Sequence, residues 1–303
     1  MMSDIYYHLG KVLKGIRENK GYTQQEVSDS TMSRSNYTKL EKDEINPNVV
    51  KFLAILDYMD MHNDEYSFIL NDYSLNDKDT VLYLFKEMEQ FPDISYVKDL
   101  IDAANKLLEK RYDHMTEDVL NIAHAYYCLI EKNSLAEAQQ YAKNIWDRLK
   151  NLDKFYLSEF HLLNGILYYF ELETAVSLTD KALEELERYY CFKEAEDLRL
   201  SFLSHISCLL IAHEQYELAL NYTDQLISKS KSDNKVLSFG AALVRKGMCL
   251  EGLNKEKESQ ESYDLAIELF NVMGREDLSK QTRENPKLVY NPYGFVDEEI
   301  KGS

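Results

Sequence analysis

Apolar residues recur at helical spacing along most of the chain, and this pattern predicts an all-α protein. Near the start, one apolar stripe follows the series i, i+4, i+7, i+8, i+11 and ends at Gly21, which predicts a first helix. The stripe consists of Ile5, Leu9, Val12, Leu13 and Ile16. Only 4 prolines and 10 glycines occur in 303 residues, so few residues interrupt the helices.

A second and a third helix follow closely. Thr23 is placed to cap the second helix, and Glu26 three residues later completes a capping box. The pattern breaks after Ser30 and restarts at Ser33, a second cap, before a third helix from Arg34 to Glu41. Two helices joined by so short a turn are typical of a helix-turn-helix, in which the second helix enters the major groove of DNA.

The third helix has an apolar and a polar side. Tyr37 and Leu40 are predicted to face inward against Val27. The outward residues are Arg34, Ser35, Asn36 and Lys39, which suit contacts in a DNA groove. Arg can form two hydrogen bonds with guanine, Asn can pair with adenine, and Ser and Lys suit phosphates. Gln24 opens the preceding helix, where the helix dipole favours a phosphate. A polar face that meets only water is the alternative interpretation of the same residues.

Two more helices are predicted to close an N-terminal bundle of five. A helix from Asn48 to Met59 is expected to turn four apolar residues inward, and a short helix follows at about Tyr66 to Leu70. The four inward residues are Val49, Phe52, Leu53 and Leu56. Asn46 and Asn48 flank Pro47 at the helix start, where they suit phosphates. The predicted DNA contacts are therefore Gln24, Ser33, Arg34, Ser35, Asn36, Lys39, Asn46 and Asn48.

The stretch "IRENKGYTQQEVSDSTMSRSNYTKLEKDEINPNVVKFLAILDYMDM" resembles the helix-turn-helix of the phage-repressor (XRE) class, and more closely that of the Rgg (Rgg/GadR/MutR) regulators of Gram-positive bacteria. The Ser-Arg-Ser opening of the third helix and the later Leu-Glu-Lys carry the likeness. The resemblance implies that Arg17 and Glu41 form an internal scaffold pair. Asp43 stands where the family favours Gly, so it is expected to adopt the left-handed conformation. The cysteine that links the DNA-binding domains of some relatives has no counterpart before Cys128.

The rest of the chain is predicted to be a helical solenoid. Stretches beginning at Phe160, Phe202 and Leu243 each pair an apolar helix with a second helix, and their starts are 42 and 41 residues apart. In the third stretch, small residues match the tetratricopeptide positions at offsets of 12 and 19; they are Gly247, Ser259 and Ala266. The repeat is a degenerate version of that pattern, as in the Rgg family, and the resemblance implies a right-handed solenoid. The expected domains are a helix-turn-helix at 1–70, a connecting helix at 71–92, and a tetratricopeptide-like peptide-binding and dimerisation domain at 93–303.

The concave side of such a solenoid commonly holds an extended peptide. In the related family the ligand is a short signalling peptide. The candidate contacts are polar or aromatic residues on the first helices of the pairs: Asn121, Tyr127, Asn164, Tyr168, His205 and Arg245. Each of them is also compatible with ordinary helix surface or core.

Charge and motifs narrow the class of protein. The net charge is -18, but residues 1–51 carry 8 Lys+Arg and 7 Asp+Glu, so only the N-terminal end suits nucleic acid, and two copies are expected to be needed. No apolar run is long enough to cross a membrane, which predicts a cytoplasmic protein. The four cysteines form no CxxC pair, and "HEQYE" lacks the second His of the zinc-protease motif. No phosphate loop occurs either. We therefore expect no bound metal, no cofactor and no enzymatic activity.

The sequence therefore predicts a homodimeric transcriptional regulator that binds an operator in double-stranded DNA and is controlled by a short signalling peptide. One alternative is a regulator whose repeat domain binds a protein partner or only dimerises. Another is an interaction scaffold that does not bind DNA.

Overall fold

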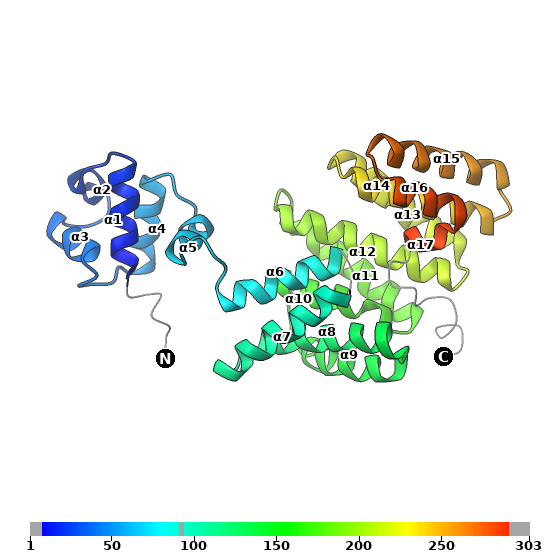
Figure 1. The fold of residues 1–303 in the computed structure, drawn as a ribbon, viewed down its shortest axis with the longest axis horizontal. Coiled ribbons are helices and arrows are strands. Elements are labelled where there is room, and N and C mark those ends of the chain that lie inside the picture. The colour runs from blue at the N-terminus through cyan, green and yellow to red at the C-terminus, as the bar shows by residue number, and fades with distance from the viewer. Residues whose placement is uncertain (1–7, 91–93, 291–303) are drawn as a thin grey trace. The chain divides into compact units, whose positions relative to one another are not determined.

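Five short helices form the first unit of the chain, residues 1–80 (Figure 1). The computed structural model describes residues 8–90 and 94–290, and the predicted core residue Ile5 lies outside them. The helices are α1 (Leu9–Asn19), α2 (Gln24–Asp29), α3 (Arg34–Glu41), α4 (Val49–Tyr58) and α5 (Asn63–Leu70). Their core consists of Leu13, Ile16, Val27, Tyr37, Leu40, Ile55, Leu56, Met59 and Tyr66.

The predicted inward face of α4 is partly wrong. Val49 is 68 % exposed and Leu53 is 50 % exposed, whereas Leu56 is buried and Phe52 packs partly buried on the core. Ile55 and Met59 take the inner positions instead. Nearly every residue of this helix is apolar, so the sequence does not define which side is buried, and packing against the rest of the bundle decides it.

Asp43 adopts the left-handed conformation expected of it, with φ of 60°. Its Oδ1 accepts a hydrogen bond from Gly10 N at 2.6 Å, at the start of α1. A Cβ on Gly10 would lie 1.7 Å from the Leu40 carbonyl oxygen, so only glycine fits where α1 crosses α3. The Asp43 side chain thus ties the end of α3 to the start of α1.

The described part of the second unit, residues 81–303, is a run of helices in which most pack against the next helix in sequence (Figure 1). The helices are α6 (Asp77–Gln90), α7 (Ile94–Lys110), α8 (His114–Lys132), α9 (Leu135–Leu149), α10 (Leu157–Ile166), α11 (Leu172–Leu186), α12 (Lys193–Ala212), α13 (Tyr216–Ser232), α14 (Val236–Gly252), α15 (Glu256–Val272), α16 (Glu276–Glu284) and α17 (Pro286–Tyr290). Two 3-10 turns, η2 (Leu167–Tyr169) and η3 (Glu187–Tyr189), follow α10 and α11. No strand occurs within the described ranges.

The expected helical solenoid is present in the second unit. The first helices of successive pairs, α8, α10, α12 and α14, contact one another in that order, and each of α8, α12 and α14 packs on the helix that follows it. Of the segment expected to connect the domains, residues 77–90 form α6, and its Val81, Phe85 and Met88 belong to the core of the second unit.

Small residues allow close packing between α14 and α15, as the repeat pattern predicted. A Cβ on Gly247 would lie 2.4 Å from Tyr263 Cε1. Ser259 Oγ donates to the Gly247 carbonyl oxygen at 2.8 Å, and Ala266 is fully buried. Larger side chains at these positions would separate the two helices.

Candidate DNA interface and polar seam

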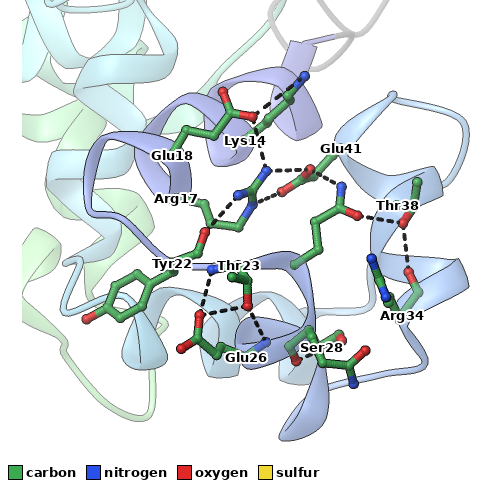
Figure 2. Close-up of polar contacts among 12 residues, drawn as sticks. Lys14, Arg17, Glu18, Tyr22, Thr23, Glu26, Ser28, Arg34, Thr38 and Glu41 are labelled. Atoms are coloured by element: carbon green, nitrogen blue, oxygen red, sulfur yellow. Dashed lines mark hydrogen bonds and ion pairs between the residues drawn. The ribbon is translucent and has the colours of Figure 1, made fainter.

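Side-chain caps fix the starts of α2 and α3. Thr23 Oγ1 accepts from Glu26 N at 3.2 Å while Thr23 N donates to Glu26 Oε2 at 2.7 Å, so the predicted capping box is formed (Figure 2). The Thr23 hydroxyl also donates to Glu26 Oε2 at 2.7 Å, and this bond, followed by the one from Thr23 N, holds the pKa of Glu26 below its ordinary value. Ser33 Oγ accepts from Asn36 N at 3.4 Å and caps α3. The two helices therefore begin where the sequence placed them, with a tight turn between them.

The outer face of α3 is polar and open to solvent. Tyr37 and Leu40 are buried beneath it against Val27. The four predicted groove-facing residues of the helix are exposed: Arg34, Ser35, Asn36 and Lys39. Among the described residues, no hydrogen bond or ion pair engages their side chains. This face is therefore available to an external partner.

Asn46 and Asn48 precede α4, at or close to its exposed start. Asn48 Oδ1 accepts from Lys51 N at 2.9 Å and caps that helix. The oxygen of this amide is thus used within the helix start, and its N–H groups remain as donors for an external acceptor. Both residues lie where a helix begins, a place that favours a phosphate.

Arg17 and Glu41 form a buried pair between α1 and α3, as the resemblance implies (Figure 2). Arg17 Nε lies 2.5 Å from Glu41 Oε1, and Nη2 lies 3.1 Å from Oε2. Arg17 Nη1 also donates to the Tyr22 carbonyl oxygen at 2.8 Å. The hydrogen bond to Glu41 is the main cause that raises the pKa of Arg17. Such a pair is costly to break because it would leave one buried charge unpaired.

Gln24 differs from the expectation that its amide points outward to a phosphate. Its Nε2 donates to Glu41 Oε2 at 2.7 Å, and its Oε1 accepts from Thr38 Oγ1 at 3.0 Å. The side chain is thus engaged between α2 and α3. A contact between Gln24 and DNA stays a prediction, and the internal partners were not foreseen because they lie 17 and 14 positions away.

Four of the predicted peptide contacts meet along α12 in the second unit. Asn164 Nδ2 donates to Ser201 Oγ at 2.8 Å, and the Tyr168 and His205 rings lie 5.0 Å apart. Arg245 donates from Nη2 to Ser204 Oγ at 2.9 Å and from Nε to Cys208 Sγ at 3.3 Å. We call this group the polar seam; its members are Asn164, Tyr168, Ser201, Ser204, His205, Cys208 and Arg245.

The polar seam is largely buried. Asn164 has no exposed area, and His205 and Arg245 are 8 % and 6 % exposed. Burial is the main cause that raises the pKa of Tyr168 well above its ordinary value. A ligand reaches Asn164 only if neighbouring side chains move. The sequence pointed to these residues as polar positions on first helices, but it did not indicate how deeply they are packed.

The other two candidates lie on α8. Asn121 Nδ2 donates to the Glu117 carbonyl oxygen of its own helix at 3.0 Å, and Tyr127 packs partly buried on the core. Neither forms a hydrogen bond with the polar seam in the described part of the chain. Sequence reasoning missed three seam residues: Ser201, Ser204 and Cys208. They share one side of α12 with His205 at three- and four-residue spacing, and this spacing could have identified them.

A cavity of about 420 Å³ adjoins the polar seam and shares Ser201 with it. Glu194 lies in its wall, 2.6 Å from Lys86 Nζ on α6 and 3.2 Å from His161 Nε2 on α10. The hydrogen bond from His161, followed by Lys86, lowers the pKa of Glu194 to about 2. The lining residues are Lys86, His161, Phe192, Lys193, Glu194, Asp197, Leu198 and Ser201.

Metal-ligand clusters and membrane-spanning helices are both absent from the described chain. Over residues 8–90 and 94–290, no group of three or more His, Cys, Asp and Glu side chains could hold a metal ion. Across the same residues, every helix is too short or too polar to span a bilayer. His124 illustrates the first point, since its ring stacks on Tyr141 rather than joining a ligand set.

Comparison with known proteins agrees with this geometry. Residues 13–64 match the helix-turn-helix family. No curated protein sequence matches the chain. Among solved structures, a protein from Listeria monocytogenes EGD-e described as a transcriptional regulator is 20 % identical, with a TM-score of 0.76; the match covers 95 % of this chain and 98 % of that one.

Two further structures are similar over nearly the full length. PlcR from Bacillus thuringiensis, solved in complex with the peptide PapR7 and DNA, is 16 % identical, with a TM-score of 0.69 and coverage of 92 % and 100 %. The SHP pheromone receptor Rgg2 from Streptococcus dysgalactiae is 14 % identical, with a TM-score of 0.66 and coverage of 92 % and 98 %. The chain therefore carries a helix-turn-helix domain at residues 13–64, and it has the fold of these three proteins.

Proposed function

We propose that this protein is a cytoplasmic, homodimeric transcriptional regulator that binds operator DNA through α3 and is controlled by a short peptide bound at the polar seam. The observation that carries the proposal is the exposed polar face of α3, which lies over a buried apolar core. Within the described chain, the side chains of Arg34, Ser35, Asn36 and Lys39 on this face bond no other residue. The proposal assigns no catalytic step to the chain.

In this proposal α3 lies in the major groove. Arg34 donates two hydrogen bonds to a guanine and Asn36 pairs with an adenine, while Ser35 and Lys39 contact phosphates. Ser33, Asn46 and Asn48, at helix starts, contribute further phosphate contacts. Residues 1–51 carry a net charge of only +1, so one copy neutralises few phosphates and binds weakly. Two copies on a palindromic operator compensate for this.

The peptide part of the proposal is supported by chemistry and by likeness. Where neighbouring side chains move to admit a ligand, the polar seam presents amide, hydroxyl, imidazole and guanidinium groups, which bind a peptide backbone and its carboxylates. PlcR, of similar fold, was solved with a peptide and DNA. Peptide binding would favour one curvature of the solenoid and so change the spacing of two DNA-binding domains, which is a shift between existing populations.

Selection from random DNA duplexes tests the DNA-binding part. The full-length wild-type chain is expected to enrich one motif composed of two related half-sites about one helical turn apart or a multiple of it. Enrichment of no motif at low salt would contradict the proposal and favour an interaction scaffold. A motif without a repeated half-site would contradict the dimeric arrangement alone.

Native mass spectrometry tests the peptide part. Protein purified from its own host is expected to give a dimer that carries a peptide of a few residues. A dimer with no additional mass would leave DNA binding intact and favour a repeat domain that only dimerises. Co-purification of a second folded protein would favour the protein-partner alternative.

A further inference from the structure

We infer that Gln24 is a positioning residue, which sets the orientation of α3 through Glu41 and Thr38 rather than acting only as a contact to DNA. The inference rests on the proposed DNA binding and assigns this residue a role within it. A chain of hydrogen bonds joins α1, α2 and α3: Arg17 donates to Glu41 (Figure 2), Gln24 donates to Glu41, and Thr38 donates to Gln24. We call these four residues the relay.

The chemistry of Glu41 gives the relay one direction. An ionised carboxylate only accepts hydrogen bonds, so the Gln24 amide must turn its Nε2 toward Glu41. Its Oε1 then faces Thr38 and accepts from the hydroxyl. The reverse orientation of the amide would bring two oxygens together at Glu41. The assignment of the two amide atoms therefore follows from the partner and not from the shape of the side chain.

Thr38 connects the relay to the turn of α3 that carries Arg34. Its hydroxyl lies 3.0 Å from Gln24 Oε1 and 3.0 Å from the Arg34 carbonyl oxygen. A hydroxyl has one proton, so these two acceptors compete for it. Without Gln24, the proton goes to the Arg34 carbonyl oxygen alone, and back-bonding of this kind bends helices. Gln24 thus acts on the backbone from which the Arg34 side chain extends.

The apolar core does not replace this control. Val27 on α2 packs with Tyr37 and Leu40 of α3, but apolar contacts have no preferred direction and tolerate small rotations. The relay adds directional bonds: Gln24 donates to the Glu41 carboxylate, which is 2 % exposed and also held by Arg17. Small rotations of α3 move its exposed side chains relative to the base edges, so the relay bears on base discrimination.

A direct phosphate contact makes a different prediction. The Gln24 amide nitrogen has two hydrogens, and the bond to Glu41 uses one of them. If Gln24 acted only through the second hydrogen on a phosphate, its removal would weaken binding to all duplexes equally and independently of Thr38. If it acts through the relay, the effects of Gln24 and Thr38 are coupled and base preference changes.

A double-mutant cycle distinguishes the two roles. The full-length variants Gln24→Met, Thr38→Val and the double variant keep side-chain size, remove one or both of the relay bonds of Gln24 and leave the Arg17–Glu41 pair in place. Gln25→Met is the matched control. Gln25 is the next residue of α2, is exposed, and its side chain bonds Asp29 within its own helix. The probe is the duplex that the wild-type chain selects from random DNA, together with single-base variants of it.

We expect Gln24→Met to bind the selected duplex roughly tenfold more weakly, as loss of a hydrogen bond to a charged group implies. The double variant is expected to be no weaker than the weaker single variant, and both single variants are expected to discriminate less between base variants. Gln25→Met is expected to match the wild type. Losses that multiply in the double variant, or unchanged base discrimination by Gln24→Met, would overturn the inference.

Folding and function are separated within the same experiment. Circular dichroism measures the helical content of each variant and so shows whether it is folded. If Gln24→Met does not fold, Thr38→Val, at a partly exposed position, tests base discrimination by itself. If the wild-type chain selects no duplex, the proposed function fails and the inference fails with it. If the wild type selects a duplex and the cycle is additive, only the inference fails.

Discussion

Glu194, in the wall of the cavity, lies between the side chains of Lys86 and His161. Its protonation therefore affects the free energy of unfolding. Lys86 and His161 belong to different helices, so the carboxylate joins α6, α10 and α12. Its pKa is about 2 in the folded chain, well below the ordinary value. The folded state therefore binds fewer protons than the unfolded state between these two values, and the stabilisation is lost as the pH falls through that window.

Replacement of Glu194 by Gln tests this linkage. Because the carboxylate side chain is 35 % exposed, water screens the interaction, and we expect a loss of only about 1 kcal/mol at pH 7. The difference from wild type is expected to shrink between about pH 4.5 and 2, where the wild type gains the proton. Urea unfolding followed by fluorescence of Trp146, the single tryptophan, on α9, reports on the second unit.

Glu196→Gln is the matched control, because it removes a carboxylate from the same first turn of α12. It is expected to leave the pH dependence unchanged. A Glu194→Gln difference that stays constant from pH 7 to 2 would show that the loss comes from packing and not from charge.

Roles that depend on local spacing were predictable from the sequence. The caps Thr23 and Ser33 act within three residues, so their partners follow from the pattern. Gln24 has partners 17 and 14 residues away, and no periodic pattern specifies them. Asp43 was expected to adopt a left-handed conformation, but its bond to Gly10 spans 33 residues and emerges only from the fold.

Among the helices, two glycines illustrate opposite uses of the same residue. Gly15 lies inside α1 with nothing within 4 Å of the position that a Cβ would occupy, whereas Gly247 in α14 faces the Tyr263 ring. Glycine inside a helix costs conformational entropy in both places. Only at Gly247 does the missing side chain allow a neighbouring helix to approach.

Alanine substitutions at these glycines are therefore expected to act in opposite directions. Gly15→Ala is expected to stabilise the first unit by about 0.5–1 kcal/mol, since alanine favours the helix and meets no neighbour. Gly247→Ala is expected to destabilise the second unit by about 1–3 kcal/mol, because the Tyr263 ring must move. Amide hydrogen exchange, measured separately over α1–α3 and over α14–α15, checks both changes in stability. If the two substitutions changed the exchange protection equally and in the same direction, the packing described here would be contradicted.

Apolar periodicity in the sequence predicted that these segments are helices, but it did not predict which side of α4 is buried. Its sequence VVKFLAIL offers apolar residues on every side, and the core selects Ile55 and Leu56 over Val49 and Leu53. The helix pairs of the solenoid were recognisable from their repeated apolar helices, and in the third pair the small residues Gly247 and Ser259 mark a close crossing. Where the pattern is redundant, tertiary packing decides.

At the scale of the whole molecule, charge and chemistry are unevenly distributed along the chain. Residues 1–51, which are nearly neutral, carry the exposed face of α3, and the remaining chain carries the whole of the negative net charge and the polar seam. The two-part organisation was predictable from the change in repeat pattern. The depth of the polar seam was not, because burial of Asn164 and Arg245 depends on helices that are far apart in the sequence.

The central claim, that the exposed face of α3 binds specific DNA, is tested most directly by Arg34→Ala. The measurement is the affinity of the full-length chain for the duplex that the wild type selects, with Arg111→Ala as a control that removes the same charge at an exposed position after α7. We expect Arg34→Ala to bind roughly 10- to 100-fold more weakly, with unchanged helical content. A bidentate hydrogen bond from Arg to guanine supplies this much discrimination against other bases. Arg111→Ala is expected to bind as the wild type does. Wild-type affinity and base preference in folded Arg34→Ala would contradict the account.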